Sequence, residues 1–135
     1  MAKLLSISEA ASIAIHSLAL IANTEKNLNA GQLAEKLGFS KNHLAKILQM
    51  LVRYNYLESE RGPKGGFRLK LDPQQISLLE IYEVIEGQLV EDKCAHNREE
   101  CPFEECVYGD IRLDLTKRFR EYFGNKKLSD ITAKK

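Results

Sequence analysis

The sequence predicts a mainly α-helical chain that contains one small β-hairpin. Apolar residues recur at helical spacing over most of the 135 residues, and side chains that can cap a helix precede several of these segments. Two short alternating segments flank a turn rich in glycine, which is typical of a hairpin. This length fits one compact core with a small appendage.

The first helix is expected from an amphipathic pattern that begins at Leu5, continues to Ile21 and should end near Asn23. The apolar run at 10–23 is interrupted by polar residues and is shorter than a membrane crossing requires. It also lacks the cleavage site of a secretory signal peptide. We therefore expect a cytoplasmic protein, with no membrane partner and with reduced thiols.

Two shorter helices should follow, separated by a tight turn. Asn29 can cap the second helix, and Gln32 can reach back to complete a capping box. Gly38 should end this helix, because glycine adopts positive φ without strain. Ser40 can cap the third helix, which is expected to run to about Tyr54.

A β-hairpin is expected next. The segments 56–60 and 67–71 alternate apolar and polar residues around the turn at 61–66, and Asp72-Pro73 then breaks the chain.

Ser77 and Glu80 predict a second capping box, with Ile76 and Ile81 as a hydrophobic staple, and Gly87 should end this fourth helix. We expect a loop at 88–106. A last long helix should then carry one apolar stripe as far as residue 124, and its members are Val107, Ile111, Leu115, Phe119 and Tyr122.

The second and third helices match the helix-turn-helix pattern. Ala34 lets the helices approach, and Gly38 supports the turn between them. The expected seam consists of Leu33, Leu37, Leu44 and Ile47. The outward face of the third helix should present side chains that donate to phosphates and base edges. These candidate DNA-binding residues are Ser40, Lys41, Asn42, His43, Lys46 and Gln49.

The hairpin adds basic residues to the same module. Arg61 and Lys64 lie at its tip, and Gly65 belongs to a turn whose composition lets the backbone approach a phosphate or an arginine enter a minor groove. Residues 31–71 hold eight Lys or Arg and three Glu, whereas residues 78–106 hold nine acidic and two basic residues. The first module should therefore bind a polyanion. Together these features predict a winged helix-turn-helix.

Three cysteines, Cys94, Cys101 and Cys106, are the only cysteines of the chain. An odd number close together in a protein without a secretory signal points to metal, iron-sulfur or redox chemistry. Thiolates suit iron-sulfur clusters and zinc. Reduced cysteines without a cofactor, or a thiol-disulfide switch, are open alternatives.

These residues resemble the IscR/NsrR (Rrf-two) family of bacterial transcription regulators. The resemblance rests on the run from Gln32 to Ser40, on Asn42-His43-Leu44 and on the wing from Arg61 to Phe67. The order of the parts agrees over nearly the whole chain. It implies a winged helix-turn-helix DNA-binding domain at 1–74, a helix with a three-cysteine sensor loop at 75–106, and a dimerisation helix with a C-terminal tail at 107–135.

The resemblance implies a homodimer that binds a double-stranded DNA operator with two-fold-related half-sites, as a repressor rather than as an enzyme. Operator binding would respond to iron-sulfur status, nitric oxide or redox state through a [2Fe-2S] or [4Fe-4S] cluster. The implied ligands are Cys94, Cys101 and Cys106. Glu9 of the partner subunit is the first candidate for the fourth ligand and His96 is the second. Glu104 and Glu105 rank after them.

The cysteine loop departs from the family pattern in two ways. The gaps between its cysteines are six and four residues, whereas the best-known members space theirs more evenly. Gly109 stands where some members place a histidine.

A cluster-free or thiol-switch regulator of the same fold is the alternative. A small iron-sulfur redox protein, a thiol enzyme and a protein-interaction scaffold are more remote, and the first two leave the basic hairpin unexplained.

Overall fold

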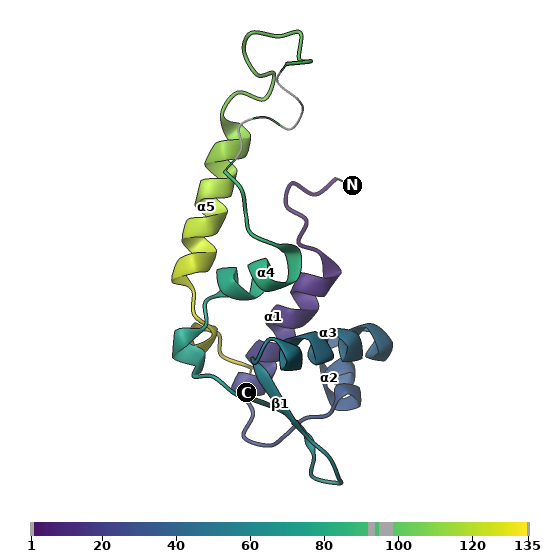
Figure 1. Cartoon of the computed structure of the whole chain (residues 1–135). Coiled ribbons are helices and arrows are strands. Elements are labelled where there is room, and N and C mark those ends of the chain that lie inside the picture. The colour runs from purple at the N-terminus through teal and green to yellow at the C-terminus, as the bar shows by residue number, and fades with distance from the viewer. Residues whose placement is uncertain (1, 92–93, 95–98, 135) are drawn as a thin grey trace.

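The computed structural model describes residues 2–91, 94 and 99–134. The helices and strands are α1 (Glu9–Ala22), α2 (Ala30–Leu37), α3 (Lys41–Arg53), β1 (Leu57–Glu60), β2 (Gly66–Leu69), α4 (Leu78–Glu86) and α5 (Ile111–Asn125), with short 3-10 turns at Pro73–Gln75 and Leu128–Asp130. This architecture confirms the mainly α fold with a hairpin. Figure 1 shows α5 extending away from the other helices, with residues 99–110 at its far end and the hairpin at the opposite end of the molecule.

The helix-turn-helix has the expected boundaries. Asn29 and Gln32 form both hydrogen bonds of the capping box that opens α2, and Gly38 ends the helix with a φ of 78°. Ser40 then caps α3, which stops at Tyr54. The sequence predicted these boundaries because each capping residue satisfies backbone groups that a helix end leaves unpaired.

Helix α1 begins later than predicted. Ser8 caps its first turn by accepting a hydrogen bond from the backbone N–H of Ala11, so the helix starts at Glu9. Leu5, which was expected on the apolar face, precedes the helix and is exposed. The predicted end at Asn23 is confirmed. The apolar pattern continued beyond the helix, and the cap determined where the helix begins.

The hairpin pairs β1 and β2 antiparallel, with Leu57 opposite Leu69 and Glu60 opposite Gly66. An isolated bridge joins Phe67 to Leu28, which lies between α1 and α2. The hairpin is therefore attached to the helical part at its base.

The core lies between α1, α3 and α4, and α1 packs against both other helices. Its fully buried apolar side chains include Ile13, Leu18, Leu33, Leu44, Leu48, Leu51, Leu57, Ile76, Ile81 and Leu128. Ser17 is also fully buried, and its hydroxyl has no hydrogen-bond partner among the described residues.

Helix α4 keeps its predicted cap but not the full capping box. Ser77 accepts from the backbone N–H of Glu80, and Gly87 follows the last turn. The carboxylate of Glu80 accepts instead from the hydroxyl of Tyr56, which makes that half of the prediction wrong. A tertiary hydrogen bond has taken the place of a local one.

The segment after α5 folds back into the core rather than forming a free tail. The backbone N–H of Leu128 donates to Ile76 at 2.8 Å, and the Leu128 side chain is fully buried. Asn23 holds the same segment through Ile131 and Ala133. The start of the last helix also differs from the prediction, since Val107 precedes α5 by four residues. No helix in residues 2–91, 94 and 99–134 has the length and apolar character that a membrane crossing requires.

Candidate nucleic-acid interface and cysteine pocket

The first turn of α3 presents polar side chains to solvent. Ser40 caps the helix through its hydroxyl, which accepts from the backbone N–H of His43 at 3.4 Å. The candidates Lys41, Asn42, Lys46 and Gln49 are all exposed, and His43 is half-buried. Because Leu44, Leu48 and Leu51 hold the opposite face in the core, this row is fixed outward.

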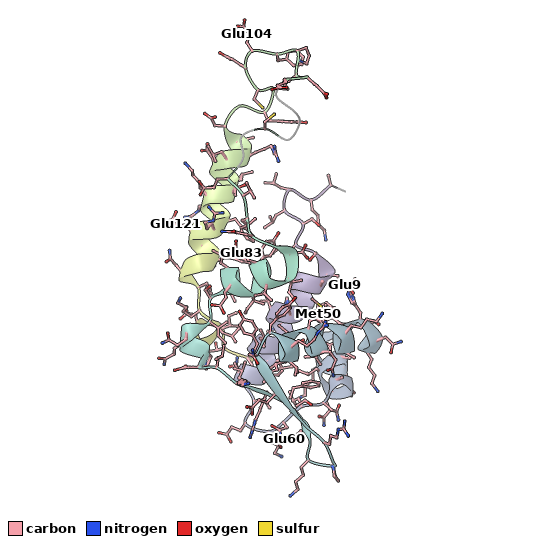
Figure 2. All side chains as sticks on the ribbon, in the orientation of Figure 1. Glu9, Met50, Glu60, Glu83, Glu104 and Glu121 are labelled. Atoms are coloured by element: carbon pink, nitrogen blue, oxygen red, sulfur yellow. The ribbon has the colours of Figure 1, made fainter. Side chains whose placement is uncertain are left out.

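His43 lies close to Glu9 of the same chain. Its Nδ1 atom is 3.5 Å from a carboxylate oxygen of Glu9, an ion pair when the imidazole is protonated. Figure 2 shows Glu9 at the start of α1, well separated from Glu104 in the cysteine loop. Within one chain, therefore, Glu9 contacts α3 and not the cysteines.

The turn between α2 and α3 is supported from α1. His16 packs edge-on against Phe39, with 5.9 Å between the ring centroids. Ala34 is buried, and of the expected seam residues Leu33, Leu44 and Ile47 are buried while Leu37 is half-buried. The relative position of the two short helices is thus fixed by packing, as base reading requires.

Arg61 and Lys64 are exposed at the tip of the hairpin. Neither side chain forms an ion pair within the described part of the chain, whereas Arg68 contacts Glu58 at 3.0 Å and Glu60 at 3.2 Å. Two cations at the tip therefore remain available to an external anion.

Gly65 has an internal reason to be glycine. A Cβ atom at this position would lie 2.3 Å from the carbonyl oxygen of Glu60, so the turn cannot close around a larger residue. Gly62, at a φ of 102°, supplies the left-handed conformation of the same turn. The glycines of the tip are explained by chain geometry before any approach of DNA is considered.

The three cysteines line one pocket. Its volume is about 380 Å³, and Cys94, Cys101 and Cys106 share its wall with Phe103, Glu104, Glu105, Gly109 and Asp110. Cys94 and Cys101 are half-buried, and Cys106 is exposed. The fold thus brings together the three residues that the sequence singled out.

The residue types of this donor set fit an iron-sulfur cluster or zinc, because thiolates are ligands of both. The described residues hold no group of three His, Cys, Asp or Glu side chains at metal-binding distances. His96, the second candidate for a fourth ligand, lies outside the described residues. Cluster binding would therefore require the thiols to draw closer than they lie here.

The segment that leads from α4 into the cysteine loop is fixed at its base. Glu83 accepts from the backbone N–H of Leu89 at 2.8 Å. Arg120 of α5 donates to Glu91 at 2.6 Å and to the carbonyl oxygen of Leu89. These contacts attach the start of the loop to both α4 and α5.

Sequence reasoning missed the link between the winged part and α4. Tyr56 lies between α3 and β1, and its hydroxyl donates to the carboxylate of Glu80 at 2.5 Å. Burial and this hydrogen bond raise the pKa of Tyr56 above its ordinary value. The pairing has no local sequence signal, since the residues are 24 positions apart.

A short helix pair with a reading helix and a basic wing defines the winged helix-turn-helix class. The family model described as "Iron-dependent Transcriptional regulator" matches residues 7–134. The chain therefore belongs to the Rrf2 family, whose members are transcription regulators and not enzymes.

Two curated relatives illustrate the range of similarity. The putative HTH-type transcriptional regulator BadM of Rhodopseudomonas palustris is 40% identical over 96 residues, which are 70% of this chain and 62% of the relative. The HTH-type transcriptional regulator NsrR of Bacillus subtilis is 43% identical over 53 residues, 39% of this chain and 36% of the relative. The matches thus span less than two thirds of these relatives.

Solved structures match nearly the whole fold. CymR, the global cysteine regulator of B. subtilis, superposes with a TM-score of 0.76 at 21% identity, and the match covers 94% of this chain and 95% of CymR. IscR of T. potens gives 0.73 at 22% identity, over 94% and 85%. At these identities the likeness establishes the fold.

Proposed function

We propose that the chain is a DNA-binding transcriptional repressor that places α3 in the major groove and the hairpin tip in a neighbouring minor groove. The observation that carries the proposal is the exposed polar first turn of α3 together with the two unpaired cations Arg61 and Lys64. Phosphate contacts from the wing would position the protein, and the reading helix would supply base contacts. A bound repressor would occlude transcription from the operator.

The test is a duplex enriched by the wild-type protein from a random-sequence pool. Replacing Arg61 and Lys64 with Ala should weaken binding and lower the slope of log affinity against log salt by about one for each lost phosphate contact. Arg112→Ala with Lys117→Ala removes the same charge from α5 and serves as the control. An unchanged slope in the wing variant would remove the wing from the mechanism.

The proposed assembly is a cytoplasmic homodimer joined through α5. An apolar row on this helix remains exposed, with Ile111 52%, Leu115 45% and Tyr122 53% accessible, and Val107, just before the helix, is 73% accessible. Such a row in one chain is expected to be covered by a partner. A two-fold dimer would present two reading helices to an operator with two-fold-related half-sites.

Cys94, Cys101 and Cys106 are the proposed ligands of a [2Fe-2S] or [4Fe-4S] cluster, with Glu9 of the partner subunit or His96 as the fourth. The shared pocket of the three thiols supports this assignment. When bound, the cluster would supply a labile centre that reacts with oxygen or nitric oxide. The protein's own contribution would be transmission, because the base of the loop is fixed to α4 and α5 through Glu83 and Arg120.

Anaerobic purification with iron and sulfide analysis and a visible spectrum tests the cluster. Stoichiometric iron and sulfide with visible absorption are expected. Colourless, iron-free protein that cannot be reconstituted would contradict the cluster and leave DNA binding intact.

A cluster-free thiol switch is the second candidate. It is favoured by the placement of all three cysteines in the wall of one pocket, with Cys106 exposed. Peroxide treatment followed by non-reducing mass spectrometry should then reveal one intramolecular disulfide and altered duplex binding. Unaltered binding after oxidation would contradict this candidate.

A further inference from the structure

The hairpin is joined to the loop between α1 and α2 by one side chain. The amide nitrogen Nδ2 of Asn27 donates to a carboxylate oxygen of Glu60 at 3.2 Å and to the carbonyl oxygen of Lys64 at 3.3 Å. Figure 2 labels Glu60 on the hairpin, near the end of β1. Asn27 thus contacts both sides of the turn that carries Arg61 and Lys64.

The backbone beside Asn27 fixes the same contact. The N–H of Phe67 donates to the carbonyl oxygen of Leu28 at 2.8 Å. A Cβ atom on Gly66 would lie 2.6 Å from that oxygen, so the hairpin can approach this closely only with glycine there. The register between the hairpin and the preceding loop is therefore set at the residue next to Asn27.

Glu60 is the acidic residue nearest the tip in sequence. One of its oxygens lies 3.2 Å from Nη1 of Arg68, and the other accepts from Asn27. Both oxygens are thus engaged away from the tip, and within the described residues Glu60 forms no ion pair with Arg61 or Lys64. A released carboxylate so close to these cations would compete with a DNA phosphate for them.

We propose that Asn27 is a positioning residue for DNA binding: it holds the Glu60 carboxylate and the Lys64 carbonyl, and so keeps Arg61 and Lys64 oriented and available to phosphates. This inference depends on the proposed DNA-binding function. Asn27 itself is half-buried and contributes no apolar surface to the core. Its loss should therefore affect the hairpin far more than the global fold.

The experiment compares wild type, Asn27→Ala, Asn27→Asp, Glu60→Gln and the double variant Asn27→Ala with Glu60→Gln. The probe is a duplex enriched by wild-type protein from a random-sequence pool. Asn27→Ala should bind about threefold to tenfold more weakly, the range expected for the loss of one ordinary hydrogen bond, with a lower salt slope. Asn27→Asp should be at least as weak, because it keeps the shape, loses the donor and adds a charge beside Glu60. Glu60→Gln should restore binding to the double variant.

Two further readouts separate positioning from a merely structural role. Thermal unfolding of Asn27→Ala should match that of Gln75→Ala, an exposed polar control outside the hairpin. Hydrogen exchange without DNA should be faster in Asn27→Ala at the tip amides, including that of Gly65, which donates to Gly62. Tight wild-type binding with unchanged affinity and salt slope in Asn27→Ala or Asn27→Asp would overturn the inference alone. Wild-type protein that enriches no duplex would overturn the proposed function as well.

Discussion

The winged helix-turn-helix and the cysteine loop with α5 differ in how much apolar surface each buries within one chain. Helices α1 to α3 enclose fully buried side chains such as Leu18, Leu44 and Leu48. Helix α5 has no buried residue among its fifteen. Its contact with α4 is a half-exposed aromatic group, in which Phe119 lies 5.1 Å from Tyr82 and 4.2 Å from Phe123, centroid to centroid.

Exposed apolar side chains follow the same division. Within residues 9–76, Tyr54 and Leu71 are the large exposed apolar residues. Across the described residues of 90–122 they are Val90, Phe103, Val107, Tyr108, Ile111, Leu115 and Tyr122. The first region therefore buries most of its large apolar side chains within the chain, whereas the second leaves many of them exposed. Helix α4 contacts both regions. Glu80 accepts from Tyr56 and Glu86 accepts from Ser8, and Tyr82 packs against Phe119 of α5.

The largest difference between the two regions is expected when one leucine in each is truncated. Leu48→Ala, at a fully buried site, should lower the free energy of unfolding by about 2 to 5 kcal/mol. Leu115→Ala, at a site 45% exposed, should cost less than about 1 kcal/mol in the monomer. Denaturant titration at a concentration below dimer formation measures both. Equal costs would mean that α5 is as well packed as the core.

Charged substitutions on α5 test whether its exposed apolar side chains bind a partner subunit. Ile111→Glu with Leu115→Glu should weaken self-association by about a hundredfold, because two apolar side chains would no longer be buried against a partner. Sedimentation equilibrium measures the change, and Asp114→Ala is the control on the same helix. A dimer that survives the double variant would place the interface elsewhere.

The link between the regions can be cut at Tyr56. Tyr56→Phe should lower the free energy of unfolding by about 1 to 2 kcal/mol, because a hydrogen bond to a carboxylate is lost. The folded pKa of Tyr56 is raised, so the wild type binds this proton more tightly than the unfolded chain. Its contribution is complete below about pH 10 and is lost as pH rises beyond that value. Denaturant curves from pH 7 to 11 should show this decline in the wild type only. Parallel declines in both proteins would contradict the assignment.

The smallest effect is expected at Ser17, in the core of the winged helix-turn-helix. Ser17→Ala removes a buried hydroxyl that has no hydrogen-bond partner among the described residues, so it should raise the free energy of unfolding by up to about 1 kcal/mol. Ser12→Ala, half-exposed on the same helix, should be close to neutral. Thermal unfolding compares the two. Destabilisation by Ser17→Ala would indicate that the hydroxyl is satisfied in the folded protein.

The winged part was largely predictable because its signals are local. Asn29, Gly38 and Ser40 each act within one turn, and their caps form as expected. The exposed face of α3 and the cations at the hairpin tip also followed from residue spacing. Leu5 misled the prediction because an apolar residue before a helix resembles one inside it, and only the Ser8 cap separates the two.

Long-range contacts could not be predicted. Asn27 gave no sign of bonding Glu60, since 33 residues separate them. The carboxylate of Glu80 could serve its own helix or Tyr56, and packing decided for Tyr56. The backbone hydrogen bond from Leu128 to Ile76 places the segment after α5 in the core, where the sequence predicted a C-terminal tail.

Local sequence patterns were sufficient to predict the order of the helices, the basic surface of α3 and the hairpin, and the grouping of three cysteines in one loop. These depend on backbone capping, residue period and chain proximity, which act over a few residues. Tertiary structure alone decided that Glu9 lies beside His43, that Asn27 holds the hairpin, and that α5 keeps its apolar row exposed. Each of those depends on which distant surfaces meet when the core closes, and no local preference encodes that choice.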